Sequence, residues 1–439
     1  MKMPPEPTTP TPSLPTPSSN RIVAIDALRG FALFGILLVN AAFFAMPLGI
    51  SMAPTSNIAS GGDLFTALLI KVFVEMKFIS IFSLLFGVGL AIQRERAIAR
   101  GRGFFGFVYR RLGVLALFGI FHALLLWYGD ILFLYACIGS LMVLLLPCSA
   151  RTLFIIGACL LLTSTLLISA FTFITTLFEQ PIMPTGEPLA FQAPAPRGLD
   201  AIIEADLNPR HPTWHQAEIV AYSEGPFLDA LAFRSVSWGF YLIVSMFTMS
   251  GYIAGMFLIG AALWKSGFFK GTAPSVAWRK PILLLGLGIG LPLSILSTSI
   301  QHFTDAPGWM ALSATTQFLG AACIALGLVS LFMILGEAGI LPGARGFAAV
   351  GRMSLSVYLL ETIAFVTITS HWGFGAFGTF SHLELFCISI AIYAVILLLS
   401  IAWQRQGWIG PAEWLWRTLA YTRSVEWKTR PIRGSGDAS

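Results

Sequence analysis

Residues 22–46 read IVAIDALRGFALFGILLVNAAFFAM, and this stretch decides the class of the protein. A helix needs about 20 predominantly apolar residues to cross the hydrocarbon core of a bilayer, which is about 30 Å thick. The stretch is long enough to cross it. Its apolar residues follow one another without the ten-residue alternation that is typical of a membrane β-barrel. We therefore predict a transmembrane α-helix here.

Similar apolar runs recur along almost the whole chain, so we predict an all-α, polytopic membrane bundle of about ten transmembrane helices. The predicted spans are residues 22–46, 78–93, 112–128, 131–147, 152–178, 238–264, 281–301, 311–336, 353–370 and 383–403. An amphipathic stretch, 64–77, precedes the second span. Together the two would form a helix about 45 Å long. We therefore expect a break near Lys77, with the first part at the interface or re-entering the membrane.

The composition excludes an ordinary cytosolic enzyme. Of the 439 residues, 11% are charged and 56% are hydrophobic, whereas soluble proteins average about 25% charged residues. The net charge of +6 fits a surface that faces anionic lipid, and we expect no nucleic-acid partner.

The distribution of basic residues predicts the orientation. If both termini are cytoplasmic, the inner segments hold 21 of the 27 Lys and Arg residues, and the outer segments hold three. The inner loop 94–111 alone carries six arginines. Short cytoplasmic loops are enriched in Lys and Arg. We therefore expect a multi-pass protein of the bacterial plasma (inner) membrane, with both termini inside.

The same reasoning divides the chain into five parts. Two five-span halves flank an extracytoplasmic cap, in which we expect short helices from residue 199 onward, and a tail lies at each end. These parts are a disordered cytoplasmic tail (1–20), the N-terminal half (21–178), the cap (179–237), the C-terminal half (238–403) and a basic cytoplasmic tail (404–439).

Polar residues within spans are costly and are therefore candidates for function. Asp26 and Arg29 are three residues apart on one face of the first span, and Asn40 follows nearer its outer end. One interpretation is a structural ion pair that fixes helix packing. The other is an arginine that lines a cytoplasmic cavity and binds an anionic ligand.

His122 and Glu361 both lie near the membrane midplane, about 16 and 14 Å from the inner arginines that precede them. His122 is either a packing histidine or a general base. The two side chains would form an acid–base or orienting pair if their helices are neighbours. Asp130, eight residues after His122, is expected at the outer turn, too far along the helix to contact His122.

Two further clusters have alternative interpretations. His211, His215 and Glu218 could supply metal ligands, but they lie in a predicted loop without an HExxH pattern, so we predict no metal site. The six arginines of the inner loop 94–111 either contact lipid phosphates or bind a nucleotide-like donor. The neighbouring glycines do not have the spacing of a phosphate-binding loop.

Five strings resemble the YeiB family of bacterial inner-membrane proteins. They are RIVAIDALRGFALFGILLVN, FSLLFGVGLAIQ, RRLGVLALFGIFHALLLWYGDIL, GRMSLSVYLLE and GPAEWLWRTLAY, and the last two are the most specific. The resemblance covers residues 21–421. That family is similar in turn to the transmembrane acyltransferases, which include the acyltransferase 3 proteins and the heparan-glucosaminide N-acetyltransferases.

The resemblance implies transfer of an acyl group from cytoplasmic acyl-CoA to an extracytoplasmic glycan or lipid. Acyltransferase 3 proteins carry an arginine and, eleven residues later, a catalytic histidine. Here Arg29 matches the arginine, but Asn40 occupies the histidine position, as in the acetyltransferase branch. That branch has its histidine in the next outer segment, whereas residues 47–63 contain none. His122 is then the membrane-embedded substitute.

The resemblance thus implies three catalytic candidates, His122, Glu361 and Asn40, with Asp26 and Asp130 in supporting positions. The donor phosphates would contact Arg29, Arg94, Arg96, Arg110 and Arg111. We expect no bound cofactor, acyl-CoA as co-substrate, and membrane lipid as a partner; homo-oligomerisation stays open. The alternatives are a proton-coupled transporter that uses His122 and Glu361, and a non-catalytic membrane scaffold or sensor.

Overall fold

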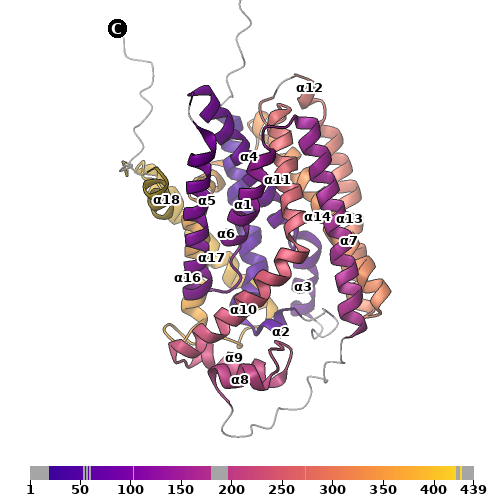
Figure 1. The fold of residues 1–439 in the computed structure, drawn as a ribbon, viewed down its shortest axis with the longest axis vertical. Coiled ribbons are helices and arrows are strands. Elements are labelled where there is room, and N and C mark those ends of the chain that lie inside the picture. Colours follow the sequence, from indigo (N-terminus) through magenta and orange to yellow (C-terminus); the bar gives the residue numbers. More distant parts are fainter. Residues whose placement is uncertain are drawn as a thin grey trace, which may run out of the picture.

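The structure is a computed structural model that describes residues 19–52, 55, 58, 61–101, 103–178, 196–271, 273–421 and 426–427. The described chain folds into a bundle of long helices (Figure 1), which confirms the predicted all-α, polytopic architecture. Most of the predicted N-terminal tail, the first part of the cap and the end of the C-terminal tail lie outside the described residues.

The N-terminal half contains seven α-helices. They are α1 (Ser19–Ala45), α2 (Leu48–Ser51), α3 (Gly62–Phe73), α4 (Lys77–Ala99), α5 (Phe104–Phe121), α6 (Leu132–Met142) and α7 (Ala150–Leu177). A π-helical turn, His122–Leu126, extends α5, and a 3₁₀ turn, Val143–Leu145, extends α6.

Two short helices follow, α8 (Gly198–Glu204) and α9 (Pro212–Ser223), where short helices are predicted in the cap. The C-terminal half contains the remaining helices. They are α10 (Phe227–Thr248), α11 (Ser250–Lys265), α12 (Ala273–Val276), α13 (Arg279–Phe303), α14 (Pro307–Glu337), α15 (Ala344–Arg352), α16 (Ser354–Thr369), α17 (His382–Arg405) and α18 (Pro411–Tyr421).

Within the described residues, seven helices are long and apolar enough to span a membrane: α1, α5, α7, α10, α13, α14 and α17. The pair α15 and α16, bent by 88°, makes an eighth if it counts as one span. The two other predicted spans, 78–93 and 131–147, correspond to α4 and to the short α6 with its 3₁₀ turn. The sixth predicted span, 238–264, is divided between α10 and α11.

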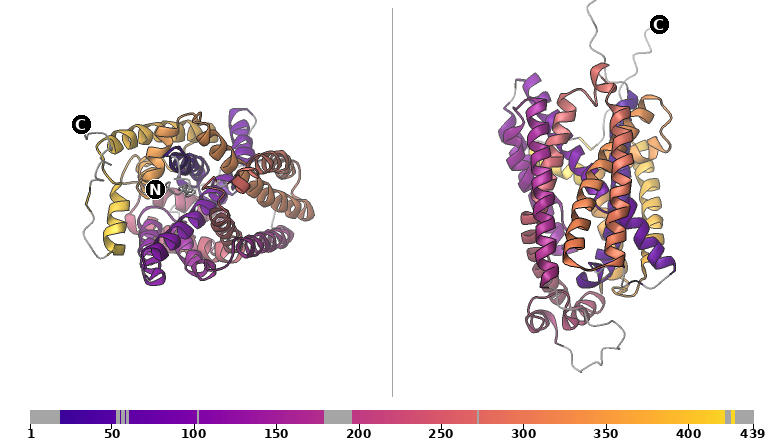
Figure 2. Two further views of the ribbon diagram at one scale, coloured as in Figure 1. Left: turned by 90° about the horizontal axis from the view of Figure 1, so that it is seen from above. Right: turned by 90° about the vertical axis from the view of Figure 1, so that its right-hand side faces the viewer.

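The helix α1 lies at the centre of the bundle. Seen along the bundle axis, its indigo ribbon is surrounded by the other helices (Figure 2). Its small and aliphatic side chains, such as Ala27, Leu28 and Leu33, are completely buried. A central position lets polar groups of α1 face protein instead of lipid, which is where ionisable residues within a membrane are found.

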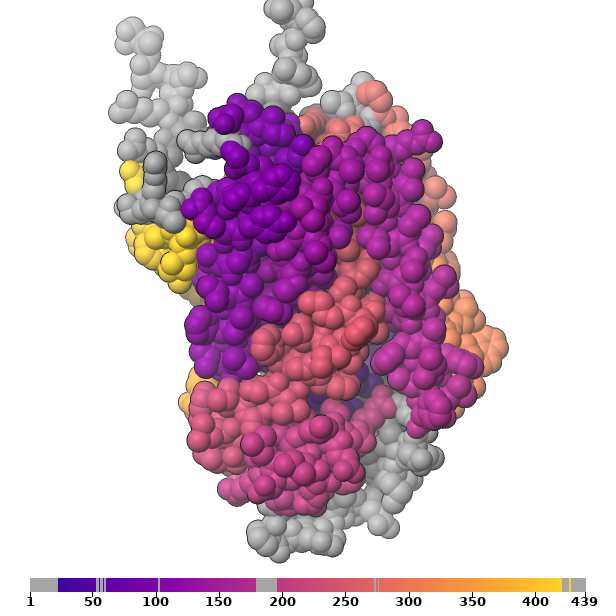
Figure 3. Space-filling view, in the orientation of Figure 1, coloured from indigo at the N-terminus to yellow at the C-terminus, as the bar shows by residue number. Residues whose placement is uncertain are grey.

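A helix of a predicted inner segment and helices of the predicted cap lie at opposite ends of the bundle, as the prediction requires. In Figure 1, α12 lies at the upper end, within a predicted inner segment, and α8 and α9 lie at the lower end, within the predicted cap. In the space-filling view, the pink and magenta atoms of α8, α9 and α10 close the lower part of the visible face (Figure 3). We therefore refer to the upper end as cytoplasmic, following the arginine distribution.

The predicted break near Lys77 is confirmed. Helix α3 ends at Phe73, and Met76 has a left-handed backbone conformation with φ of 65° before α4 begins at Lys77. The Nζ atom of the buried Lys77 donates to the carbonyl oxygen of Lys71 at 2.7 Å, which satisfies one of the carbonyls at the end of α3. The break turns α3 away from the axis of α4.

Candidate functional site

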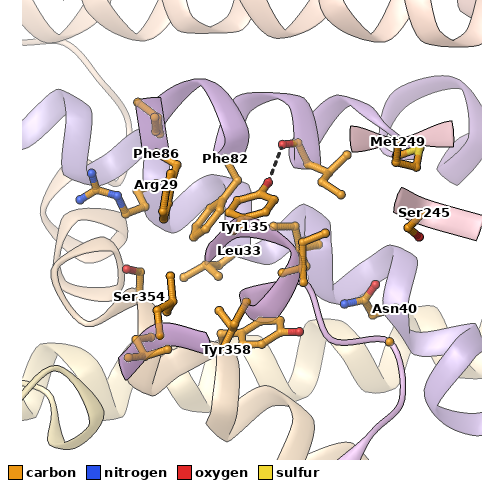
Figure 4. Close-up of a pocket in the computed structure, with 18 of the residues that line it drawn as sticks. Arg29, Leu33, Asn40, Phe82, Phe86, Tyr135, Ser245, Met249, Ser354 and Tyr358 are labelled. Carbon is orange, nitrogen blue, oxygen red and sulfur yellow. Dashed lines mark hydrogen bonds between the residues drawn. The ribbon is translucent and has the colours of Figure 1, made fainter. Parts of the chain in front are cut away.

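A cavity of about 570 Å³ lies inside the bundle. It is lined by residues of α1, α2, α4, α5, α6, α10, α15, α16 and α18, together with the loop 127–131 and the break between α3 and α4. In Figure 4, Arg29 and Ser354 lie at one end, Asn40 and Ser245 lie at the other, and Phe82, Phe86 and Leu33 lie between them. The cavity therefore has polar groups at its two ends and an apolar middle. Arg29 and Asn40 are about 16 Å apart along α1.

Arginine side chains gather at the cytoplasmic end of the cavity. Four of them line it: Arg29, Arg111, Arg352 and Arg417. Arg29 is part-buried and pairs with Asp26, whose carboxylate oxygen lies 3.2 Å from its guanidinium. Arg417 has no hydrogen bond or ion pair to any part of the chain that the structure describes. Guanidinium groups bind carboxylates and phosphates in bidentate geometry, so this end is suited to an anion.

A close crossing of α1 and α15 brings Arg29 and Arg352 to the same end. A Cβ atom on Gly30 would lie 2.0 Å from the carbonyl oxygen of Phe347, and one on Gly351 would lie 1.8 Å from that of Asp26. Only glycine permits such an approach of two backbones. Each arginine is the sequence neighbour of one of these glycines, so the crossing fixes the position of both guanidinium groups.

Glu413 joins the two most specific sequence strings to each other. Its Oε1 accepts hydrogen bonds from the backbone nitrogens of Leu355, at 2.6 Å, and Ser356, at 3.3 Å, and its Oε2 accepts from the Ser356 hydroxyl. A carboxylate at a helix N-terminus accepts hydrogen bonds from unpaired N–H groups and interacts favourably with the helix dipole. Burial raises the pKa of this carboxyl group, while these hydrogen bonds lower it. The contact attaches α18 to the start of α16.

The helix α18 also closes one side of the cavity. The indole nitrogen of Trp416 donates to the carbonyl oxygen of Arg111 at 2.9 Å, and the Arg111 guanidinium lies 4.0 Å from the centre of the Trp416 ring. A cation over an indole ring is attracted by the quadrupole of the ring. The segment 404–439, predicted as a tail, thus contains a helix that contributes Trp416 and Arg417 to the cavity wall.

Beyond the arginines, hydrogen-bonding side chains line the cavity, among them Asn40 and Glu75 at its outer end and Tyr358 nearer its middle (Figure 4). Asn40 lines it, and its side-chain amide has no hydrogen bond to the described residues. The hydroxyl of Tyr358 is buried and also has no partner. Glu75 lines the cavity at the break between α3 and α4, where it lies 3.6 Å from the Nζ atom of Lys71. These groups are available to a bound molecule.

The loop 127–131 forms part of the outer wall of the cavity. The chain leaves the π-helical turn at Trp127, which is extended with φ of −157°, and re-enters a helix at Leu132. Non-helical backbone within a membrane is tolerated only where it is buried in protein or lines a cavity. Trp127, Tyr128, Gly129 and Ile131 line this one.

His122 and Asp130 hold this loop in place, and this corrects the expectation that they are too far apart to touch. The Nδ1 atom of His122 lies 3.0 Å from Oδ1 of Asp130, and its Nε2 atom lies 3.0 Å from the hydroxyl of Thr362. The other carboxylate oxygen of Asp130 accepts from the backbone nitrogen of Phe133 at 2.7 Å, near the start of α6. The expectation assumed a continuous helix, whereas the chain folds back after Leu126.

A neutral imidazole satisfies this arrangement. With the proton on Nδ1, the ring donates to Asp130, and the Thr362 hydroxyl has two acceptors for its one proton: Nε2 of His122, at 3.0 Å, and the carbonyl oxygen of Tyr358, at 3.2 Å. A hydroxyl, an imidazole and a carboxylate in this order also form the triads of many hydrolases. Here all three side chains are buried and none of them lines the cavity. They lie directly behind its wall, since the His122 ring centre is 4.9 Å from that of Tyr358.

The other predicted site residues are not brought together. The ring nitrogens of His122 bond to Asp130 and Thr362, so His122 and Glu361 do not form a hydrogen-bonded pair. Glu361 is buried away from the cavity, and its Oε1 has no hydrogen-bond partner. The cavity lining includes Arg29 and Arg111 but not the three remaining donor-binding candidates, Arg94, Arg96 and Arg110.

In the cap, two of the three candidate metal ligands, His211 and Glu218, have other hydrogen-bond partners. His211 Nδ1 accepts from the backbone nitrogen of Thr213 at the start of α9. Glu218 accepts from the backbone nitrogen of Leu48, at 3.2 Å, and from the Trp214 indole, at 3.1 Å. Burial raises the pKa of Glu218 to about 8 and lowers that of His215. No three His, Cys, Asp or Glu side chains in the described part of the chain could hold a metal ion together.

Sequence reasoning missed four residues of the site: Thr362, Arg352, Glu413 and Arg417. Three of them lie within the two most specific strings, so the strings themselves were the available signal. Glu413 and Arg417 stand four residues apart in the amphipathic segment after Gly410, which is the spacing of one helix face. Thr362 directly follows Glu361, and no sequence pattern relates it to His122.

Comparisons with known proteins identify the family of the chain. The family described as "Protein of unknown function (DUF418)" matches residues 263–423, which contain both strings joined by Glu413. The chain is 31% identical to the uncharacterized protein YxaH of Bacillus subtilis (strain 168), over 92% of this chain and 95% of the relative. It is 30% identical to the uncharacterized protein YeiB of Escherichia coli (strain K12), over 91% and 96%. The chain therefore belongs to the YeiB family.

Proposed function

We propose that this protein is an acyltransferase of the bacterial plasma membrane. It binds cytoplasmic acyl-CoA in the cavity and transfers the acyl group to an extracytoplasmic glycan or lipid. The observation that carries the proposal is the cavity itself, which joins a group of arginines to the unpaired amide of Asn40 about 16 Å deeper. Its volume of about 570 Å³ lies in the range of small-molecule sites.

The donor would lie along the cavity with its phosphates at the arginines. Arg29, Arg111, Arg352 and Arg417 would bind the phosphates of the nucleotide part at the cytoplasmic mouth. The pantetheine arm and the acyl chain would pass between the apolar side chains of the middle section, such as Phe82. This arrangement keeps the charged part of CoA out of the hydrocarbon core, where charge is costly.

The transfer itself requires an acceptor hydroxyl or amine at the outer end. Its oxygen or nitrogen attacks the thioester carbonyl, the new C–O or C–N bond forms, the C–S bond breaks, and CoA leaves as a thiol that takes up a proton. The Asn40 amide would donate to the oxyanion of the tetrahedral intermediate. Of the two carboxylates in the cavity lining, Glu413 caps α16, so Glu75 would accept the acceptor's proton.

In this proposal His122 is a positioning residue. Its ring nitrogens are both engaged behind the wall, and its contact with Asp130 fixes the loop that carries Trp127 and Tyr128. Loss of this contact would displace the outer wall and the polar groups beside it. A displacement of about 1 Å can cost about a hundredfold in rate when a reaction depends on orientation.

A transporter is the second candidate, and the broken spans favour it. The cavity is lined at Thr248 and Met249, where α10 gives way to α11, and along the loop 127–131. Discontinuous helices around a central site are typical of secondary transporters. In that case the bound anion would cross the membrane without reacting.

Binding of the donor is the first test. The thermal unfolding midpoint of the purified protein would be measured with acetyl-CoA, with longer acyl-CoAs and with acyl-pantetheine, which lacks the nucleotide. We expect the midpoint to rise with acyl-CoA and not with acyl-pantetheine, because the arginines bind the phosphates. If no acyl-CoA of any chain length raises the midpoint, the acyltransferase proposal is wrong.

The fate of the acyl group separates the two candidates. Inside-out membrane vesicles that contain the protein would receive acyl-CoA labelled in the acyl group. An acyltransferase leaves the label covalently attached to a lipid or glycan inside the vesicle, together with free CoA outside. A transporter delivers the intact labelled anion to the interior.

A further inference from the structure

A second, much smaller void lies between the cap and the outer end of the bundle. Its volume is about 10 Å³, which is about the size that holds one water molecule or a small ion. Tyr222 of α9, Arg234 of α10 and Ser370, after the end of α16, line it. Trp127 and Tyr128 line both this void and the large cavity, so the two spaces share a wall.

Arg234 has a buried positive charge without a counter-ion. Its side chain is 1% exposed, and no carboxylate of the described residues lies within ion-pair distance. Its Nε donates to the carbonyl oxygen of Leu124 at 2.9 Å, whereas its Nη2 has no hydrogen-bond partner. A buried guanidinium in this state is costly unless an anion accompanies it.

A second donor in the void also has no acceptor. The hydroxyl of Tyr222, which is 6% exposed, has no hydrogen-bond partner. Glu218, one turn earlier in α9, forms no ion pair with Arg234 within the described residues: its Oε2 accepts from Leu48 and Trp214, and its Oε1 has no hydrogen-bond partner. Burial also raises the pKa of Glu218 to about 8, so this group is mostly protonated near pH 7.

We propose that this void binds one small inorganic anion of the size of chloride, between Nη2 of Arg234 and the hydroxyl of Tyr222. The anion neutralises the guanidinium and accepts a hydrogen bond from each group. It thereby connects three elements. These are the cap through Tyr222, the span α10 through Arg234, and the π-helical turn through the bond from Arg234 to Leu124. The site lies outside the large cavity and does not depend on acyl transfer.

The test uses the purified full-length protein, with chloride replaced by gluconate at constant ionic strength. We expect the thermal unfolding midpoint to rise with chloride concentration and to saturate, because an anion that binds the folded state stabilises it. Arg234→Gln should abolish this dependence. Tyr222→Phe keeps the charge and removes one donor, so the apparent affinity for chloride should fall roughly tenfold.

Arg197→Gln is the matched control. Arg197 is also at the outer end, but its side chain is 61% exposed and lies 3.8 Å from Glu224, so the response to chloride should persist. In a structure determined in bromide, an anomalous peak is expected in the void. Three results would overturn the proposal: no chloride dependence in the wild type, an unchanged affinity in Tyr222→Phe, or an ordered water in place of bromide. If Arg234→Gln does not fold, the chloride affinity of Tyr222→Phe still tests the proposal.

Discussion

The Oδ1 atom of Asp130 lies 3.0 Å from Nδ1 of His122, although eight residues separate them in the chain. On a continuous helix the two would be about 12 Å apart. The π-helical turn and the extended Trp127 return the chain toward α5, and Asp130 then reaches both His122 and the first turn of α6. The contact therefore holds the wall segment 127–131 of the cavity, which has no helix of its own.

Asp130→Ala should destabilise the protein by roughly 3 kcal/mol. The substitution leaves two buried donors without acceptors, Nδ1 of His122 and the backbone nitrogen of Phe133. The thermal unfolding midpoint of the purified variant measures the loss. Asp305→Ala, at an exposed position, should leave the midpoint nearly unchanged. An equal effect of the two substitutions would mean that the network behind the wall contributes nothing to stability.

Arg417→Gln should weaken acyl-CoA binding roughly tenfold while the fold stays intact. The side chain lines the cavity and makes no contact within the described chain that the substitution would break, so the loss reports on a phosphate contact. Calorimetric titration with a non-hydrolysable acyl-CoA analogue measures it. Arg110→Gln removes the same charge at an exposed position off the cavity and should bind as the wild type does. Similar affinities for the analogue in the wild type, Arg417→Gln and Arg110→Gln would exclude Arg417 from the donor site.

Gly351→Ala should destabilise the protein and weaken donor binding together. The added Cβ atom would lie 1.8 Å from the carbonyl oxygen of Asp26, so α1 and α15 must separate and carry Arg29 and Arg352 with them. Gly288→Ala is the control, since a Cβ atom there meets open space and alanine favours a helix. Unfolding midpoints and acyl-CoA titrations compare the two. If Gly351→Ala binds normally, the crossing does not set the donor site.

Glu413 and Ser356 should show strong energetic coupling. Glu413→Ala removes the acceptor at the start of α16, and Ser356→Ala removes one of its three donors. Both substitutions break the Glu413–Ser356 contact, so the double variant should be less stable than Glu413→Ala alone only by the hydrogen bond that the Ser356 hydroxyl accepts from the backbone nitrogen of Ala412, at 2.9 Å. The expected coupling is about 1–3 kcal/mol. Unfolding midpoints of the four proteins measure it, and strictly additive effects would contradict a shared contact.

The stability of the cap should decrease from acid to neutral pH through Glu218. Burial raises its pKa from 4.5 to about 8, so the folded state keeps a proton that the unfolded chain has already released. Between about pH 4.5 and 8 the folded state binds more protons, and stability falls as the pH rises through this window. Glu218→Gln should have a higher unfolding midpoint at pH 8 and a weaker pH dependence than the wild type. Glu224→Gln, exposed at the end of the same helix, should retain the wild-type slope.

The sequence predicted the architecture because the signals for membrane spans are local. Length, apolar composition and the side preference of arginine can all be read within one segment, so the helices lie close to the predicted ranges. The break near Lys77 was predictable for the same reason, since the apolar stretch was too long for one span. Arg29 and Asn40 were recognised as candidates because polar residues are conspicuous in an apolar run, and both line the cavity.

The contacts of the site were not predictable, because they join distant segments. His122 is identified from its depth, and it would pair with Glu361 if their helices are neighbours. The two helices do meet, but the ring contacts Thr362, the residue after Glu361, and Asp130, which the chain returns to it after Leu126. Arg94, Arg96 and Arg110 were expected at the donor site from their position in a basic loop. Side-chain direction depends on helix rotation and packing, and among the described arginines of that loop only Arg111 lines the cavity.

The sequence by itself therefore determined that this is a membrane protein of many helices with an arginine-rich inner side. Only the tertiary structure decided which polar groups share a space. The crossing at Gly30 and Gly351 sets the distance between two helices that are far apart in the chain. The hydrogen bonds of Glu413 to the start of α16 bring α18 to the cavity. The physical reason is the distance along the chain over which each interaction acts. Hydrophobicity acts residue by residue along a segment, whereas a site is formed by close contacts whose geometry depends on every helix packed around it.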